Sequence, residues 1–388
     1  MKRENSENAR QNNIIDFPKE LKNNPVKKTG CLAVVFVCIL ATVLICSTLS
    51  KNSNFSSTTA VDEEPISLSE SNNYDVEKYL DGFIVAKDGR ITCYNTAQLP
   101  QWEFSASKTA PEIAVNGTYA LVYYSDDKEA YVTNGKKTKK IETTDDISYG
   151  YVNSNGYSVM FLDEAGLKNK IVVYNKAGDL IYYRDNPDRQ IAFAALSDDN
   201  KSLVTIELLF EEKHISSELI ITNVKNNTSV SKTKFDDAIP AKCIYTSKNR
   251  LIILFDTKMQ CYNLAGKLKW EKTFDNRQAN MVAYNDGVFA LVFSDNEINS
   301  QGNAVIFFND KGKKVGEFYT RERIADIDVC GHTALLTNGR KLMLINSKGK
   351  IVSNADTTYD VRKTMFMNNK RAALVISGSQ EIKLVALN

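Results

Sequence analysis

Histidine is nearly absent from this sequence of 388 residues, and so are several groupings on which enzymes commonly depend. The two histidines, His214 and His332, stand far apart, and neither has a neighbour at the spacing that a metal site requires. No Walker phosphate loop, no GxSxG nucleophile motif and no plausible pairing of cysteine with histidine occurs. We therefore expect no catalytic centre, no metal site and no cofactor, and predict that the chain is not an enzyme.

The sequence also lacks an excess of charge of either sign over its main part. The formal net charge is +2, but residues 1–30 carry seven Lys or Arg and four Asp or Glu, so the rest sums to −1. Binding to phosphate backbones needs a basic face. We therefore exclude nucleic acid as a partner.

Cysteine is scarce, and no CxxC pair occurs. Three cysteines lie in one apolar stretch and four are scattered over the remainder: Cys31, Cys38 and Cys46, then Cys93, Cys243, Cys261 and Cys330. This spacing indicates neither a zinc site nor a disulfide scaffold. We expect the four scattered cysteines to be small hydrophobic side chains within strands.

One long apolar run is present, at residues 31–49, where nineteen residues follow one another without a charge. At about 1.5 Å of rise per residue, a helix of this length just crosses a hydrocarbon core of about 30 Å. A cleaved signal peptide is the alternative, but its apolar region is usually about 7–15 residues long. We predict a transmembrane signal-anchor helix.

Lysines set the orientation of this helix. Lys27 and Lys28 precede it while only Lys51 follows closely, and the positive-inside rule then places the N-terminus in the cytoplasm. The expected order is a disordered cytoplasmic tail at 1–30, the membrane helix at 31–49, a Ser/Thr/Asn-rich linker at 50–64 and an extracytoplasmic domain at 65–388.

The sequence of this last part, residues 65–388, contains an internal repeat. Eight runs rich in β-branched and aromatic residues each end in asparagine, at intervals of 37 to 48 residues: Asn95, Asn134, Asn175, Asn223, Asn263, Asn309, Asn346 and Asn388. A period of about forty residues is typical of β-propellers, in which each unit is a four-stranded sheet. We predict an all-β, eight-bladed β-propeller, with seven blades as the alternative should unit one or two prove degenerate.

The residues after these asparagines support the assignment. Glycine follows three positions later at Gly178, Gly266, Gly312 and Gly349, and Asn226 holds that position in unit four. This spacing suits a turn whose first side chain accepts a local hydrogen bond and whose fourth residue has positive φ. Dipeptides such as Asn-Gly and Asp-Gly, earlier in each unit, predict a tight hairpin.

The last unit ends after three strands. We predict that the segment Pro65–Ser71, just before unit one, supplies its outer strand and so joins the two ends of the ring. Closing the ring removes free sheet edges.

Two stretches carry a resemblance to a known family. "NLAGKLKW", from Asn263 to Trp270, and "NTAQLPQW", from Asn95 to Trp102, resemble the repeats of pyrroloquinoline-quinone-dehydrogenase-like and WD40/YVTN-like propellers. Quinoprotein relatives hold a quinone and calcium in the channel, so the resemblance implies a quinoprotein-like enzyme as an alternative. In its whole architecture, the chain resembles a family of membrane-anchored propellers of low-GC Gram-positive anaerobes with a domain of unknown function, which implies no established activity.

Function is more readily expected in the loops. The second loop of each unit and the connection to the next unit lie on one face of a propeller, and here the second loops vary in length. We expect that face to bind a protein or cell-envelope component, with the propeller itself monomeric; a cell-surface sensor is a further alternative. The candidate residues are Asp163, Glu164, Lys168, Glu211, Glu212, His214, Asp295, Glu297, Arg189, Arg277 and Arg323.

Acidic residues also gather in the connections on this face, for example at Asp145, Asp185 and Asp356. A ring of carboxylates attracts cations or basic segments, but aspartate is also common in turns because it caps local amides. We favour the second interpretation because arginines are interspersed among these acids.

Overall fold

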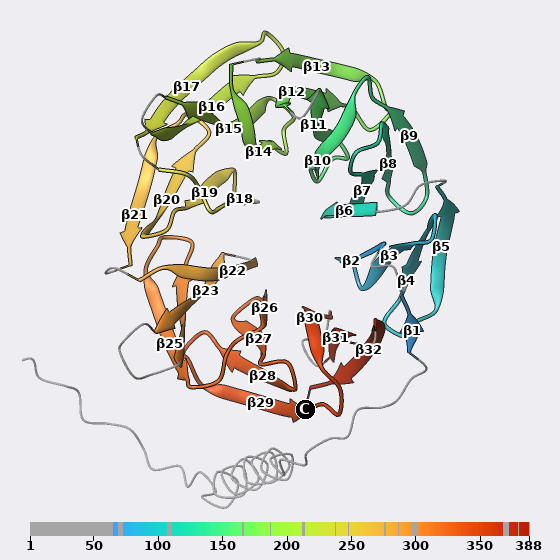
Figure 1. The fold of residues 1–388 in the computed structure, drawn as a ribbon, viewed down its shortest axis with the longest axis vertical. Helices are drawn as coiled ribbons and strands as arrows, with labels where there is room; N and C mark the ends of the chain where they lie inside the picture. Colours follow the sequence, from blue (N-terminus) through green and yellow to red (C-terminus); the bar gives the residue numbers. More distant parts are fainter. Residues whose placement is uncertain are drawn as a thin grey trace, which may run out of the picture. The chain divides into compact units, whose positions relative to one another are not determined.

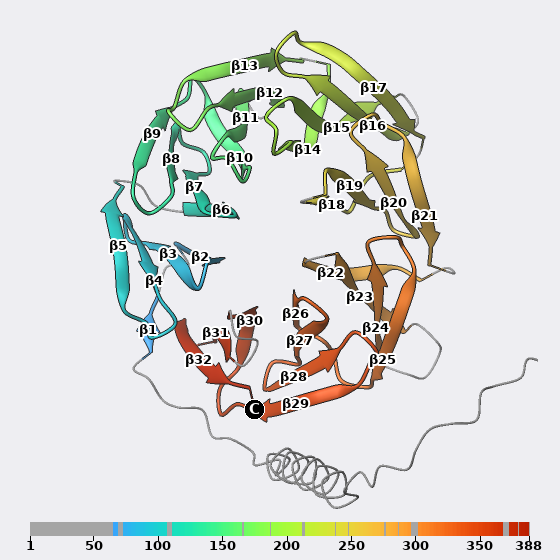
Figure 2. The same ribbon diagram turned by 180° about the vertical axis from the view of Figure 1, so that it is seen from behind.

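Eight four-stranded antiparallel sheets surround a common axis in the computed structural model of this chain (Figures 1 and 2). The structure describes residues 65–387 except 69–72, 107–110, 165–166, 187, 212–213, 237, 247, 275–276, 286, 296–301, 368–371 and 379. The predicted tail, membrane helix and linker lie outside the described residues. Within the described part, no helix is long and apolar enough to cross a membrane.

The first four blades follow one another along the chain, and in each the first strand is nearest the axis (Figure 1). Blade one contains β2 (Tyr74–Tyr79), β3 (Gly82–Lys87), β4 (Arg90–Tyr94) and β5 (Pro100–Ser105); blade two, β6 (Pro111–Asn116), β7 (Tyr119–Tyr124), β8 (Glu129–Thr133) and β9 (Thr138–Glu142). Blade three contains β10 (Asp146–Val152), β11 (Ser158–Glu164), β12 (Leu167–Tyr174) and β13 (Leu180–Asp185); blade four, β14 (Gln190–Leu196), β15 (Ser202–Phe210), β16 (Ile215–Asn223) and β17 (Thr228–Phe235).

The other blades repeat this order. Blade five contains β18 (Lys242–Thr246), β19 (Arg250–Leu254), β20 (Lys258–Asn263) and β21 (Leu268–Thr273); blade six, β22 (Ala279–Asn285), β23 (Val288–Asp295), β24 (Gly302–Asn309) and β25 (Lys314–Thr320). Blade seven contains β26 (Asp326–Cys330), β27 (Thr333–Thr337), β28 (Lys341–Asn346) and β29 (Ile351–Asp356); blade eight, β30 (Val361–Phe366), β31 (Ala372–Ser377), β32 (Glu381–Ala386) and β1 (Ile66–Ser67). The prediction of eight blades is therefore confirmed.

Blade eight closes the ring as predicted. Strand β1 pairs with β32 in antiparallel register, with Ile66 opposite Ile382 and Ser67 opposite Glu381. The backbone N–H of Leu68 extends the pairing by donating to the carbonyl of Gln380 (2.8 Å), and its side chain is buried. The two ends of the described chain thus share one sheet.

The turn between the third and fourth strand has the predicted chemistry. In blade five the Oδ1 of Asn263 accepts the backbone N–H groups of Ala265 (3.2 Å) and Lys267 (2.9 Å), and Gly266 has φ 73°. We call this the Asn turn; the seven described ones span residues 95–99, 134–137, 175–179, 223–227, 263–267, 309–313 and 346–350.

One turn differs from its prediction. In blade four Asn227, and not Asn226, has positive φ (52°). In blade four Asn223 itself pairs with Thr228, whereas in blade five the pairing ends at Tyr262 and Leu268. Four residues instead of five therefore lie between the paired positions, a difference that the spacing of the glycines in the other units does not reveal.

The apolar side chains pack between blades rather than within one. Eight clusters of buried residues each join two neighbouring blades, and one of them joins blade eight to blade one through Met365 and Phe83. Cys93 and Cys261 are buried in strands of these clusters, as expected. Trp270 reaches the next blade, where its Nε1 donates to the carbonyl of Asp310 (3.0 Å).

The strand order gives the ring two distinct faces. Because neighbouring strands alternate in direction, the first and third turns of every blade lie at one end, and the second loops and blade connections lie at the other. We call these ends the Asn-turn face and the loop face. Strand β1 runs antiparallel to β32, from the direction of the Asn-turn face toward the loop face, and its residues pair with Glu381 and Ile382 at the loop-face end of β32.

Candidate functional site

The hairpin of β15 and β16 carries an exposed apolar tip on the loop face. Both strands are nine residues long, and their register pairs Phe210 directly with Ile215. These side chains are 56% and 38% exposed. Beyond them, the backbone N–H of Glu211 donates to the carbonyl of His214 (3.0 Å) and their side chains form an ion pair when His214 is protonated. Two adjacent apolar side chains therefore face solvent at the end of an ordered hairpin.

A buried carboxylate fixes the base of this hairpin. The side chain of Glu207 in β15 has no exposed surface and forms ion pairs with Arg184 from β13 and Arg189 from the blade connection. The amide of Asn186 donates to its Oε2 (3.0 Å) and the hydroxyl of Thr205 to its Oε1 (3.0 Å). Since both oxygens have partners, the charge is compensated and blade three is tied to blade four.

The arginines predicted to contact a partner have different surroundings. Arg189 also forms an ion pair with Glu218 in β16, so it holds the hairpin base. Arg277 lies over the ring of Phe293, 5.3 Å from its centroid. Arg323 is exposed on the loop face. The structure therefore gives two of the three a role within the fold.

The acidic and lysine candidates are only partly described. Asp163 is half-buried at the end of β11, where a bulge shifts the register opposite Lys168. The side chains of Glu164, Lys168 and Asp295 and all of Glu212 and Glu297 lie outside the described part, so these predictions are untested. Among the described candidates, Glu211 and His214 are the pair that the structure brings together.

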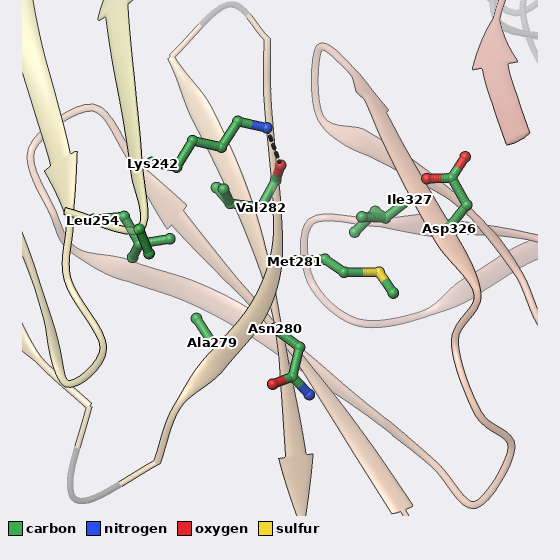
Figure 3. A pocket seen from close by; sticks show the side chains of 9 residues that line it. Lys242, Leu254, Ala279, Asn280, Met281, Val282, Asp326 and Ile327 are labelled. Carbon is green, nitrogen blue, oxygen red and sulfur yellow. Dashed lines mark hydrogen bonds between the residues drawn. The ribbon is translucent and has the colours of Figure 1, made fainter. Parts of the chain in front are cut away.

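A second site, which the sequence reasoning missed, lies among the innermost strands. A pocket of about 410 Å³ is lined by residues of β2, β18, β22, β26 and β30. Its charged side chains come from both sides of the axis: Glu77, Lys78, Lys242, Asp326, Asp328 and Lys363. A neighbouring pocket of about 340 Å³ shares Lys242, whose ammonium donates to the carbonyl of Val282 (3.3 Å; Figure 3).

Carboxylates in this region connect the inner strands of adjacent blades. Asp326 accepts the backbone N–H of Thr364 (2.6 Å), Asp328 that of Phe366 (2.7 Å), and Asp75 that of Ile113 (2.8 Å). The Lys363 ammonium donates to Glu77 (2.7 Å). These bonds run from β26 through β30 and β2 to β6.

Burial changes the acidity of these groups. It raises the pKa of Asp75, Glu77 and Asp328 because it disfavours their charged forms. Burial alone would lower the pKa of Lys363, but the charge and hydrogen bond of Glu77 together with the charges of Asp75 and Asp326 outweigh it, and the pKa is raised. Asp75 and Asp328 accept backbone N–H groups, and the Lys363 ammonium donates to Glu77. Most of these charged groups therefore have partners within the protein.

These residues do not fit the quinone and calcium that the quinoprotein resemblance implies. The carboxylates nearest the axis already accept backbone N–H groups of the next blade, and no group of three metal-ligating side chains occurs among the described residues. Calcium in proteins takes about six to eight oxygen ligands. The cysteines are equally committed to packing: burial raises the pKa of Cys93 and Cys261 to about 11.

One signal in the sequence points to the inner site. The first strands of units one and seven place acids at alternate positions, Asp75 and Glu77 in "YDVEKY" and Asp326 and Asp328 in "DIDVC", and the first strand of unit eight, "VRKTMF", contains Lys363. Alternate residues of a strand share a face. The two acids of each strand therefore lie on the same side of it, although the strands to which they bond cannot be read from the spacing.

The family model of the Family of unknown function (DUF5711) matches residues 51–387. The chain belongs to this family. No curated protein sequence matches it significantly.

Two solved structures are similar to this chain. BamB from Moraxella catarrhalis superposes with a TM-score of 0.54 at 11% identity, covering 84% of this chain and 100% of that chain. The Cps50 (Swd1) β-propeller domain of Myceliophteria thermophila gives 0.49 at 9% identity, covering 86% and 100%. The likeness to BamB establishes the propeller fold and nothing of its partners.

Proposed function

We propose that this chain is a non-enzymatic binding module that holds a protein partner on the loop face of a propeller outside the cytoplasmic membrane. The observation that carries the proposal is the exposed pair of Phe210 and Ile215 at the tip of the β15–β16 hairpin. Large apolar side chains exposed side by side are typical of contact sites, whereas scattered ones are ordinary.

The hairpin suits this role because it is ordered before a partner arrives. Cross-strand pairing runs without a bulge from Ser202 to Phe210, and the Glu207 ion pairs hold its base. A stiff element loses little conformational entropy on binding, so more of the contact energy appears as affinity. Aromatic and aliphatic anchors of this kind often carry most of the binding free energy.

The membrane location rests on the sequence. Residues 31–49 are long enough and apolar enough for a spanning helix, and Lys27 and Lys28 favour a cytoplasmic N-terminus. The propeller then lies outside the cytoplasm, tethered through residues 50–64. A scaffold of this type needs no catalytic group.

Replacing both tip residues with serine tests the partner site. We expect Phe210→Ser with Ile215→Ser to abolish co-purification of the partner from native membranes, while the melting temperature stays unchanged because both side chains are solvent-exposed. The matched control is Val230→Ser with Val352→Ser, which removes two exposed apolar side chains from outer strands away from the loop face. Equal capture by both variants would contradict the assignment of this hairpin.

A further inference from the structure

Lysines are concentrated in the Asn turns. The seven described turns contain nine lysines and two aspartates, a net charge of +7, whereas residues 31–388 together sum to −1. All nine lysines are exposed, and the ion pairs seen among the described residues involve none of them. One aspartate, Asp310, is already paired with Lys248 (2.7 Å). The described first turns on the same face add Asp81, Asp198 and Asp199 together with Lys201 and Lys248, a net charge of −1, so the turns of the Asn-turn face still sum to a positive charge.

Exposed apolar side chains stand beside these lysines. Leu180, Leu268 and Ile351 are the first residues of β13, β21 and β29, each directly after its turn, and they are 52%, 43% and 50% exposed. Leu99, just before β5, is 58% exposed. Ammonium groups next to exposed aliphatic side chains are the composition of surfaces that lie in the lipid headgroup region.

The short connection between the apolar run and the propeller bears on which surface contacts the Asn-turn face. Strand β1 runs from the direction of the Asn-turn face toward the loop face and pairs with the first two residues of β32. Only the fifteen residues 50–64 separate it from the apolar run 31–49. A flexible tether of this length has an average end-to-end distance of roughly 20 Å. A propeller on so short a tether stays close to the membrane that holds the predicted helix.

We propose that the Asn-turn face docks on anionic lipid headgroups of the membrane that anchors the chain. The inference rests on the membrane anchor in the proposed function and adds the orientation of the propeller. With the Asn-turn face on the bilayer, the opposite face presents Phe210 and Ile215 away from the membrane. Docking and partner capture then use opposite ends of one rigid ring.

Lysine acylation on the full chain tests the docking. The protein is incorporated into nanodiscs of phosphatidylcholine alone or mixed with phosphatidylglycerol, and the acylation rate of each lysine is measured by mass spectrometry. We expect Lys267, Lys311 and Lys348 to react about tenfold more slowly in the anionic discs. Lys128 on the loop face should react at the same rate in both.

Two charge-reversed variants separate this site from net charge. Lys311, Lys313, Lys348 and Lys350 are changed to Glu in one, and Arg90, Lys128, Arg321 and Arg323 in the other, so both lose the same charge. Near-UV circular dichroism confirms folding. The first variant should lose the protection of the remaining Lys267, and the second should keep it.

Equal acylation rates in the two compositions, with the chain firmly anchored, would overturn the docking while leaving the anchor intact. Failure of the chain to enter nanodiscs would instead contradict the anchor. In that case the same acylation comparison with added vesicles of the two compositions decides the docking, because anionic vesicles alone should protect these lysines.

Discussion

Glu207 illustrates how one side chain supports the candidate partner site. Its buried carboxylate neutralises Arg184 and Arg189 and accepts two further hydrogen bonds. We expect Glu207→Ala to lower the free energy of unfolding by about 3–5 kcal/mol, because the arginines are left without their buried counter-charge. Urea denaturation measures the change. Glu103→Ala, which breaks an exposed pair with Arg90, should cost less than about 0.5 kcal/mol, and a similar cost for both would refute this account.

Gly349 is a position where only glycine fits. Its φ is 82°, and a Cβ there would lie 1.7 Å from the backbone carbonyl oxygen of Glu317 in the neighbouring blade. Gly339 also has positive φ (105°), but a Cβ there meets nothing within 4 Å. We expect Gly349→Ala to destabilise the protein by about 2 kcal/mol more than Gly339→Ala does, measured by thermal unfolding. Equal losses would mean that the turn does not pack against the next blade as described.

At the scale of the element, Asp326 and Asp328 of the inner strand β26 accept backbone N–H groups of β30. Burial raises the pKa of Asp328, so the folded protein binds this proton more tightly than the unfolded chain does. Its contribution to stability is greatest below pH 3.8 and is lost as pH rises through the folded pKa. Asp310 is the opposite case, because the hydrogen bond from Lys248 lowers its pKa. Its contribution is present above pH 3.8 and is lost as pH falls through the folded pKa.

Urea denaturation at a series of pH values distinguishes the two. The unfolding free energy of the unmodified protein minus that of Asp328→Asn should increase as pH falls from neutral toward about 4, because the unmodified protein gains stability when Asp328 is protonated. The difference for Asp310→Asn should stay constant over that range and decrease only below it. The same trend for both variants would contradict the burial of Asp328.

The elements themselves were predictable because their signals are local. Asn263 and Gly266 define their turn from four consecutive residues, so the period of the turns predicted eight blades and the pairing of the chain ends. The bond from Asp326 to Thr364 was not predictable, because it joins residues 38 positions apart whose meeting depends on how two blades pack. Phe210 was missed as an anchor because the loop "FEEKHISS" was judged by its charged residues, and the pairing of Phe210 with Ile215 depends on a register that the sequence does not show.

For the whole molecule, stability depends on joining the two ends of the ring. Starting the chain at Asn73 removes Ile66 and the buried Leu68 and exposes the edge of β32. We expect this truncation to lower the unfolding free energy by about 3 kcal/mol or more and to promote self-association through the open edge. A chain starting at Pro65 keeps Ile66 and Leu68, so it should retain the higher unfolding free energy in urea denaturation and stay monomeric in gel filtration. Identical behaviour of the two truncations would show that β1 does not close the ring.

Photocrosslinking in native membranes tests the central claim most directly. A photoreactive phenylalanine analogue is placed at Phe210 on the loop face and, separately, at Val230 on the outer strand of the same blade. The account predicts that the probe at position 210 crosslinks one defined protein, that the probe at position 230 does not, and that Ile215→Ser weakens the crosslink. The same crosslinks from both positions, or none from position 210, would contradict a partner site at the tip of this hairpin.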